Sequence, residues 1–397
     1  MSISKRKSSQ NRLFLILTTV CAGLFIRCSE NSPTAPDISV GSYTASSTMT
    51  TFYKTFGSAY TNEKGESVQQ TRDGGYIITG CDERDVYLIK TDMLGVETWS
   101  KKIGGEHRDC GKFVQQTRDG GYIITGLMNQ KTVNGYNYDL YLIKTNSSGN
   151  VTWTKTFGGD INDSGSSVQQ TNDGGYIITG STESFGAGGS DIYLIKTNAL
   201  GKATWTKTFG GAGDDYGISV QQTSDGGYVV VGNSVNYSTN NSLLIIKTNA
   251  KGRMIWEKTF DNSYYKYDGS VQQTHDGGYI VSGGNKLIKL NASGVAIWER
   301  TLIGISESLQ QTRDRGYIIS GYVSSSFDPA YRDLYLTKTD ASGLIIWTKK
   351  FCPAQNGHGR SVQQTNDGGY IVAGDAFTNG IASNIVLIKT DDLGNIN

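Results

Sequence analysis

The chain has 397 residues, of which 37% are hydrophobic and 18% charged, so it is long enough for a large core and is not disordered by composition. Lys and Arg total 37 against 36 for Asp and Glu, so the net charge of +1 excludes a general attraction to nucleic acid or to an anionic membrane. The 51 glycines and 23 tyrosines beside only 4 prolines favour an all-β chain with many tight turns.

Residues 1–28 have the order of an export signal. Basic residues up to Arg12 precede an apolar stretch of 14 residues, 13–26, which is shorter than the ~20 residues that span a bilayer. Cys28 is followed by a polar tether, residues 29–50. This order resembles that of a bacterial lipoprotein, in which such a cysteine is lipidated after cleavage. We predict an exported protein, on the cell surface, in the periplasm or secreted, with Cys28 as the lipidation candidate and the only link to a membrane.

The rest of the chain, residues 51–397, is an internal repeat. The segment Ser67-Val68-Gln69-Gln70-Thr71 recurs with minor variants, so that seven copies begin at residues 67, 113, 167, 219, 270, 308 and 361. The spacings are 46, 54, 52, 51, 38 and 53 residues. They are too irregular for a solenoid of constant rise, but they suit propeller blades whose loops differ in length.

Each copy contains four short strand-like segments, which we name A to D. In the third copy they are 168–171, 176–179, 192–196 and 204–209. Asp-Gly-Gly lies between A and B in six copies, and an Asp-Gly pair predicts a hairpin turn with both central residues at positive φ. The sixth copy has Arg315 in place of the first glycine, so we expect strain there or another type of turn. Between C and D, an Asn or Asp three residues before a glycine predicts a side-chain-capped turn.

Four antiparallel strands form a meander sheet that cannot bury both of its faces alone. Seven such sheets arranged radially cover one another, and we therefore predict an all-β, seven-bladed β-propeller of four-stranded antiparallel blades. The last copy ends at a C–D turn without a strand D, whereas residues 51–57 are a strand D with no copy before it. We predict that residues 51–57 pair with residues 386–389 and close the ring.

The repeat resembles the bacterial β-propeller repeat family SBBP, through residues 210–217, residues 227–232 and Trp256. The resemblance covers residues 51–394 and implies the propeller fold and an extracellular setting, with no general reaction. A more distant resemblance to quinoprotein propellers rests on a glycine turn followed by tryptophan.

Residues that occur in every copy favour a structural role, because an active site breaks the symmetry of a repeat. The paired glutamines of strand A are expected to hydrogen-bond between blades near the axis. The tryptophans of strand D are expected to pack between blades, with Tyr53 in the seventh place. These tryptophans are Trp99, Trp153, Trp205, Trp256, Trp298 and Trp347.

Signals for catalysis or metal binding are few, and we expect no catalytic residue, metal or cofactor. His107, Asp109 and Cys110 are a metal alternative without a second ligand pair. The acidic loops 160–163 and 214–215 are a calcium alternative, but turn capping is the preferred interpretation. Cys81 could form a disulfide with Cys110 in an oxidising compartment, whereas Cys352 is expected to be free.

Function is expected on the face of the B–C and D–A loops, because the other face is nearly identical in all blades. This variable face holds aromatic residues among polar ones, which suits a glycan or a polypeptide. The fifth blade has a short B–C loop, 283–285, and is expected to leave a notch in the rim. We predict a monomeric binding or interaction module; the alternative is an enzyme acting on an extracellular polymer, a glycan hydrolase or lyase, or a quinoprotein-like enzyme. The ligand-binding candidates are Tyr264, Tyr265, Tyr331, Tyr136, Tyr138 and Tyr216.

Overall fold

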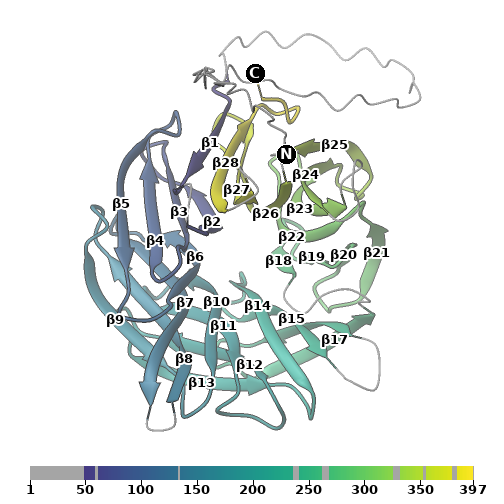
Figure 1. Cartoon of the computed structure of the whole chain (residues 1–397). Coiled ribbons are helices and arrows are strands. Elements are labelled where there is room, and N and C mark those ends of the chain that lie inside the picture. The colour runs from purple at the N-terminus through teal and green to yellow at the C-terminus, as the bar shows by residue number, and fades with distance from the viewer. Residues whose placement is uncertain are drawn as a thin grey trace, which may run out of the picture. The chain divides into compact units, whose positions relative to one another are not determined.

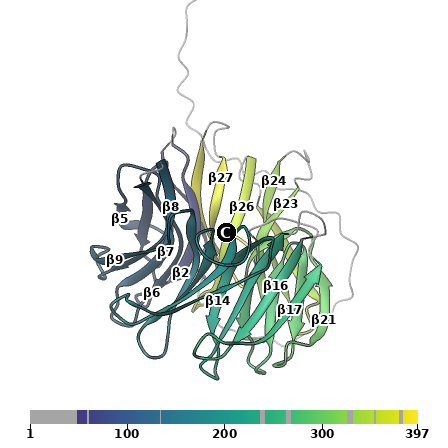
Figure 2. The same ribbon diagram turned by 90° about the horizontal axis from the view of Figure 1, so that it is seen from below.

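Each repeat forms one antiparallel sheet of four strands, and the seven sheets stand around a central axis as the blades of a β-propeller (Figure 1). Figure 2 shows the same ring turned by 90°. The fold predicted from the repeat is confirmed. The structure is a computed structural model, and it describes residues 49–58, 61–132, 135–235, 241–261, 268–324, 331–351, 355–377 and 382–396.

The chain divides into two units, residues 1–47 and 48–397, and the second unit is the propeller. The expected export signal and Cys28 lie outside the described residues. No helix in the described part of the chain has the length and apolar character needed to cross a bilayer.

Within a blade the strands follow the order A to D from the axis outward. Strands A are β2 (Lys64–Gln70), β6 (Cys110–Gln116), β10 (Asp163–Gln170), β14 (Asp214–Gln222), β18 (Ser270–Gln273), β22 (Ile305–Gln311) and β26 (Gln355–Gln364). Strands B are β3 (Tyr76–Cys81), β7 (Tyr122–Thr132), β11 (Tyr176–Thr182), β15 (Tyr228–Val235), β19 (Tyr279–Gly283), β23 (Tyr317–Ser324) and β27 (Tyr370–Phe377). Strands C are β4 (Val86–Thr91), β8 (Gly135–Thr145), β12 (Asp191–Thr197), β16 (Ser242–Thr248), β20 (Lys286–Leu290), β24 (Arg332–Thr339) and β28 (Ser383–Thr390). Strands D are β1 (Phe52–Phe56), β5 (Glu97–Ile103), β9 (Val151–Phe157), β13 (Ala203–Phe209), β17 (Met254–Asp261), β21 (Ala296–Thr301) and β25 (Ile345–Phe351).

The N-terminal strand closes the ring as predicted. Strand β1 pairs antiparallel with β28, with Phe52 opposite Lys389 and Phe56 opposite Ile385. The last blade therefore combines the first strand of the propeller with the last three, in the order β1-β28-β27-β26. This pairing covers the edge that β28 would otherwise expose.

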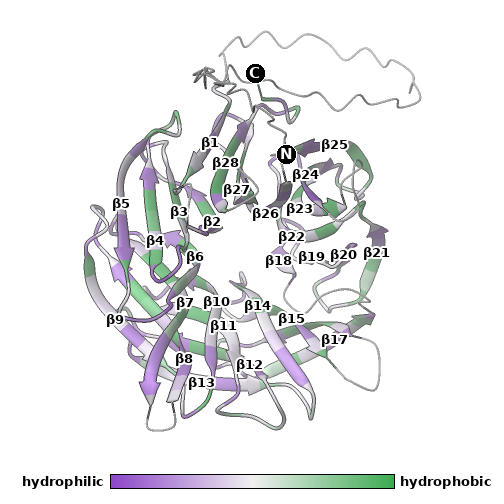
Figure 3. Cartoon of the chain, viewed as in Figure 1, coloured by the Kyte–Doolittle hydropathy of each residue, from purple (hydrophilic) through white to green (hydrophobic). Residues whose placement is uncertain are grey.

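The hydrophobic core lies between blades and not within them. Seven clusters of buried residues each join two adjacent sheets. Strands C are almost fully buried, as every residue of β12 and β28 shows, whereas strands D are largely exposed. Figure 3 shows this contrast between the hydrophobic β28 and the hydrophilic β5. The consecutive apolar residues of strand C thus reflect cover on both faces.

The A–B turns differ in type from the prediction. Only the glycine after the aspartate takes a positive φ, 85° at Gly74, while the backbone N–H of Gly74 donates to the carbonyl of Thr71. This is the geometry of a type I turn followed by a left-handed residue, not of a turn with two positive φ angles. Arg315 takes the left-handed place in the sixth blade with a φ of 67°, so the strain predicted there is present.

The paired glutamines hydrogen-bond between blades, as expected. The side-chain oxygen of Gln69 accepts the backbone N–H of Gln116 in the next blade at 2.6 Å. The side-chain oxygen of Gln116 in turn accepts the backbone N–H of Arg72 at 3.0 Å. Both contacts recur at all seven junctions, and together they form two closed rings around the axis.

Aromatic residues of strand D pack against the next blade. Trp99 contacts Tyr122 at 5.9 Å between ring centroids, and a Cβ atom on Gly149 would lie only 2.5 Å from the indole. In the seventh place Phe52, not Tyr53, makes the equivalent contacts, with Tyr76 at 6.0 Å and with Gly95. The assignment of Tyr53 was wrong by one residue, because matching Lys54-Thr55-Phe56 to Lys207-Thr208-Phe209 aligns Phe52, not Tyr53, with Trp205.

Candidate functional site

The symmetry of the ring is broken at a β-bulge in strand A. The pairing with strand B shifts around Glu66 in the first blade, between Gly65 and Ser67, so Glu66 is an extra residue with no cross-strand partner. The same shift occurs in six blades, and the extra residue differs in character from blade to blade. These residues are Glu66, Lys112, Ser166, Ile218, Glu307 and Arg360.

Four of the extra residues form a charged group that we call the bulge cluster: Glu66, Lys112, Glu307 and Arg360. Lys112 Nζ lies 2.6 Å from Glu66 Oε1, and Arg360 Nη1 lies 3.7 Å from Glu66 Oε2 and 3.8 Å from Glu307 Oε1. Arg360 Nε also donates to Asp375 Oδ1. The cluster therefore links the sixth, seventh, first and second blades.

The carboxylates of the bulge cluster are held in their ionised form. Burial acts to raise the pKa of Glu66, but the charges of Lys112 and Arg360 outweigh it and lower that pKa to about 2. Burial also opposes ionisation of Glu307, and Arg360 and His358 lower its pKa in spite of this. Glu307 Oε2 has no hydrogen-bond partner although the side chain is only 8% exposed.

His358 connects the bulge cluster to Arg332, the first residue of β24. Arg332 Nη1 lies 3.1 Å from His358 Nε2, and Glu307 Oε1 lies 3.0 Å from Nδ1. Because a guanidinium can only donate, Nε2 is the acceptor and Nδ1–H donates to Glu307. The ring of Tyr322 lies against both side chains, 4.4 Å from the His358 ring centroid and 4.5 Å from the Arg332 guanidinium.

The pKa of Asp268, just before β18, lies above the ordinary range of an aspartate. Burial and the negative charge of Glu307 raise its pKa to about 7, with Arg360 and His358 acting in the opposite sense. The same two acids, after burial, raise the pKa of Tyr335, whose hydroxyl is buried without a hydrogen-bond partner. A polar region of low solvent access thus lies between the fifth, sixth and seventh blades, on the variable face of the ring.

A cleft of about 800 Å³ opens on this face, and we call it the mouth cleft. Arg332, His358 and Arg360 form its wall on one side, and residues of the first blade and of the link to the second form the other. Cations and carboxylates are mixed along the lining, with Phe377 as the single aromatic residue other than His358. The lining residues are Asn62, Lys64, Cys81, Asp82, Glu83, Arg108, Arg332, Asn356, His358, Arg360, Asp375, Phe377 and Ser383.

Cys81 and Cys110 form a disulfide that joins the first and second blades, with the Cα atoms 4.6 Å apart. The sequence alone leaves this pairing open. It takes the place that Tyr322 and His358 occupy between the sixth and seventh blades, where strand B ends beside the next strand A. Both sulfur atoms are therefore unavailable as metal ligands. Glu66 lies close to the two cysteines, but the three residues do not form a metal site while the disulfide is intact. Cys352 lies outside the described residues.

The predicted metal alternative at His107, Asp109 and Cys110 is weakened at Asp109 as well as at Cys110. The two carboxylate oxygens of Asp109 accept backbone N–H groups of Asn129 and Gly105, each at 2.9 Å. The ring of His107 packs on Tyr136 at 4.5 Å between centroids. These residues shape the loops of the second blade.

Of the predicted ligand-binding tyrosines that the structure describes, none lines the mouth cleft. Tyr136 is exposed near the tip of the β7–β8 hairpin, and Tyr138 is half-buried on the same hairpin. Tyr216 is half-buried on β14 of the fourth blade, and Tyr331 directly precedes Arg332 of the cleft. Tyr264 and Tyr265 lie outside the described residues. The role of these tyrosines in binding stays a prediction.

The fifth blade is the shortest, as expected. Strands β19 and β20 have 5 residues each, whereas β7 and β8 of the second blade have 11 each. At ~3.3 Å per residue, the second blade extends roughly 20 Å further along the strand direction. The rim of the variable face is therefore lower at the fifth blade.

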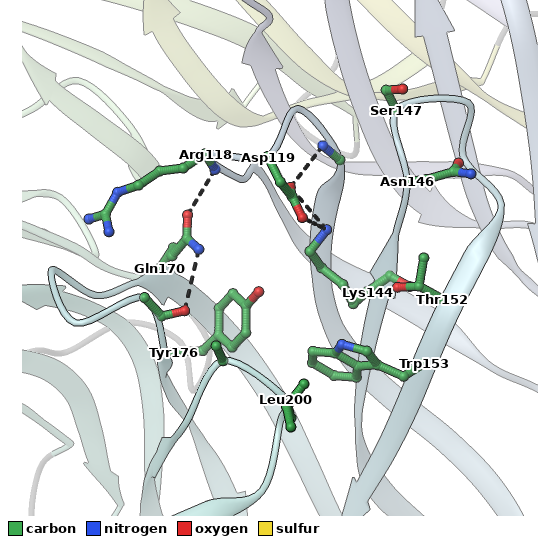
Figure 4. Close-up of a pocket in the computed structure, with 13 residues that line it drawn as sticks. Arg118, Asp119, Lys144, Asn146, Ser147, Thr152, Trp153, Gln170, Tyr176 and Leu200 are labelled. Atoms are coloured by element: carbon green, nitrogen blue, oxygen red, sulfur yellow. Dashed lines mark hydrogen bonds and ion pairs between the residues drawn. The ribbon is translucent and has the colours of Figure 1, made fainter.

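A second cavity, of about 650 Å³, lies on the opposite face between the second and third blades. Figure 4 shows its lining, with the ion pair of Lys144 and Asp119 and the packing of Trp153 near Tyr176. Equivalent ion pairs occur within other blades and equivalent aromatic contacts between other blades, so this cavity is a product of the repeat. The mouth cleft is the better candidate site because its residues are not repeated.

Sequence reasoning missed the bulge cluster and His358. The signal was present in the second residue before each Val-Gln-Gln or Leu-Gln-Gln, which is acidic in some copies, basic in others and neutral in the rest. Its meaning needed the bulge, which turns an unpaired residue out of the ladder.

Comparison with known proteins supports the fold and nothing finer. No family model matches the chain, and no curated protein is similar to it. A catalytically inactive virginiamycin B lyase from Staphylococcus aureus, solved with quinupristin, is similar at a TM-score of 0.55 and 10% identity, over 86% of this chain and 99% of that chain. BamB from Moraxella catarrhalis has a TM-score of 0.43 and 14% identity over 82% of this chain and 85% of that chain. A protein of unknown function from Bacteroides caccae has a TM-score of 0.46 and 12% identity over 73% of this chain and 94% of that chain.

Proposed function

We propose that the chain is an extracytoplasmic binding module that holds a charged polypeptide segment in the mouth cleft. The observation that carries this proposal is the placement of unlike charged residues at the bulge of strand A, where the residue differs from copy to copy and where Arg360 lines the mouth cleft. The glutamines of strand A, the lysine–aspartate pairs and the aromatic residues of strand D make contacts that recur around the ring. A propeller offers a rigid frame on which such a site can be built.

A polypeptide fits the cleft better than a neutral glycan does. Sugar sites depend on aromatic faces, and the cleft has Phe377 with the His358 ring and no tryptophan or tyrosine among its lining residues. Arg332 and Arg108 can instead pair with acidic side chains or a terminal carboxylate, while Asp82 and Glu83 can pair with basic ones. A glycan remains the alternative ligand, with the exposed Tyr136 and the predicted loop tyrosines as its platforms.

The disulfide supports an extracytoplasmic setting. Stable disulfides form in the periplasm or outside the cell and are rare in the reducing cytosol. Cys81 and Cys110 are both buried, as expected of a structural disulfide. Export through the N-terminal signal and lipidation at Cys28 are part of the same proposal.

The test is a peptide and glycan array probed with the purified chain. Arg332→Ala should weaken binding of the strongest peptide by at least about tenfold, the loss expected of a charge-assisted contact. Arg118→Ala is the matched control, because Arg118 lines the cavity of the opposite face. Peptide binding lost with Arg118→Ala and kept with Arg332→Ala would place the ligand on the wrong face for this proposal.

The glycan alternative has its own variant. Replacing Tyr264, Tyr265 and Tyr331 together by Ala should abolish a glycan hit and leave a peptide hit in the mouth cleft unchanged. An array with glycan hits alone that are lost in this variant would overturn the polypeptide proposal.

A second candidate function, an enzyme acting on an extracellular polymer, is favoured by Asp268 and Glu307. A carboxylic acid with a pKa of about 7 beside an ionised carboxylate is the arrangement used for acid and base catalysis. Against it, Glu307 is nearly fully buried and is bound to His358 and Arg360. Release of reducing sugar from cell-surface polysaccharide by the purified chain, lost in Asp268→Asn, would favour the enzyme.

A further inference from the structure

Two aspartates from adjacent blades meet at the junction between the second and third blades. Asp139, on β8, and Asp163, the first residue of β10, approach the same point above Gly158. A Cβ atom on Gly158 would lie 2.6 Å from Asp139 Oδ1 and 2.5 Å from Asp163 Oδ2. The two carboxylate oxygens therefore lie within roughly 5 Å of each other, and only glycine leaves room for them.

Three side-chain oxygens at this junction lack a protein partner. Asp139 Oδ1, Asp163 Oδ1 and Asn137 Oδ1 are buried without a hydrogen bond. Asp163 is 1% exposed and Asn137 is 6% exposed. A buried oxygen that no donor satisfies is destabilising, so three of them together call for a cation.

Asn137 belongs to the same group by its contacts. Its side-chain nitrogen donates to the backbone carbonyls of Gly159 and Ile161, at 3.2 and 3.3 Å, so the amide lies over the loop that holds Asp163. Asn137 and Asp139 are two residues apart on β8 and thus project from the same face of the sheet.

We propose that Asn137, Asp139 and Asp163 bind one calcium ion between the second and third blades. Three hard oxygen ligands with two negative charges suit Ca²⁺, which completes its six to eight ligands with backbone carbonyls and water. The other oxygen of Asp163 accepts the backbone N–H of Gly159 at 2.9 Å and the hydroxyl of Ser184 at 2.7 Å. These contacts show the turn-capping role and fix the orientation of the carboxylate, which leaves Oδ1 for the ion.

The electrostatics of the pair agree with this assignment. Burial, followed by the negative charge of Asp163, raises the pKa of Asp139. Two close carboxylates are relieved either by a bound cation or by a shared proton. The calcium proposal and the shared proton are therefore the two outcomes that the experiment must separate.

Other junctions carry parts of this arrangement and not the whole. Asp85 faces Asp109 around Gly104, and Asp191 faces Asp215 around Gly210. Both oxygens of Asp109 accept backbone N–H groups, as do Asp191 Oδ2 and Asp215 Oδ2, and no oxygen of these four aspartates is buried without a hydrogen bond. The residue two before Asp85 is the exposed Glu83, where the second blade has the buried Asn137. Asp85 consequently offers a matched control.

The experiment is calorimetric titration of the full chain, after removal of metal with EDTA, with calcium chloride. We expect one calcium ion per chain, and a rise of about 2 °C or more in Tm with excess calcium. Asp139→Asn and Asp163→Asn should each weaken calcium binding at least tenfold, whereas Asp85→Asn should not change it. Asp139 is only half-buried, so its variant is expected to fold even if Asp163→Asn does not.

Three results would overturn the proposal. The first is a wild-type chain that neither binds calcium nor gains stability from it. The second is an equal loss of binding in Asp85→Asn. The third is a pair of observations: the Tm of Asp139→Asn without calcium is higher than that of the wild type, and the wild-type Tm changes with pH but not with calcium. This pair would show that the two aspartates share a proton.

Discussion

Replacing Phe52 by Ala tests the closure of the ring at a single side chain. Phe52 is 8% exposed and packs on Tyr76 of the first blade, 6.0 Å away between centroids, with Gly95 beneath its ring. Truncating a buried phenylalanine costs about 3 to 5 kcal/mol, since contacts are lost and a cavity is left. Part of the site borders solvent and can relax, so we expect a loss of about 3 kcal/mol in the free energy of unfolding.

The assay is equilibrium unfolding in urea, followed by fluorescence and circular dichroism. The midpoint should fall while the dependence on urea concentration stays the same, because the surface exposed on unfolding is nearly unchanged. Thr55→Ala is the control, since Thr55 is exposed on the same strand and should change stability by no more than about 0.5 kcal/mol. A Phe52→Ala chain as stable as the control would refute the reasoning that β1 completes the last blade.

Three further predictions concern stability. Replacing Cys81 and Cys110 by Ser should cost roughly 3 to 4 kcal/mol, given their separation of 29 residues, and a reducing agent should then have no additional effect on the urea midpoint. Arg315→Gly should stabilise the chain by about 0.5 to 1 kcal/mol, because the left-handed φ of 67° suits glycine; no gain in Tm would contradict the strain inferred there. Burial and the charge of Glu307 raise the pKa of Asp268 from 3.8 to about 7. Between these pH values the unfolded chain has lost a proton that the folded chain keeps, so stability should fall as pH rises. In Tm measured from pH 4 to 7, Asp268→Asn should show a weaker dependence on pH than the wild-type chain.

The candidate site was only partly predictable from the repeat. The glutamines and tryptophans, which recur from copy to copy, have the structural roles expected of repeated residues. The loop tyrosines are the conspicuous residues of the variable face, and the prediction of a binding site therefore selected them. The charged residues of the bulge cluster break the symmetry as well. Single charged residues are common in strand sequences, so these four do not indicate a site until the bulge is known.

Hairpin signals and the count of copies determined what the sequence alone could settle. Hairpin signals between adjacent strands, and the matching deficits at residues 51–57 and 391–397, specified the blades, their number and the closing pair. These features depend on contacts between neighbours in the chain or on an exact count of copies. The sequence therefore determined the propeller, its strand order and its closure.

Tertiary structure decided the features that depend on contacts between blades. Glu66 and Arg360 are 294 positions apart, and they meet only because the ring closes and the bulge turns both out of their ladders. Pairing of Cys81 with Cys110, and the meeting of Asp139 with Asp163, likewise depend on how two sheets face each other, which no local pattern in either blade encodes.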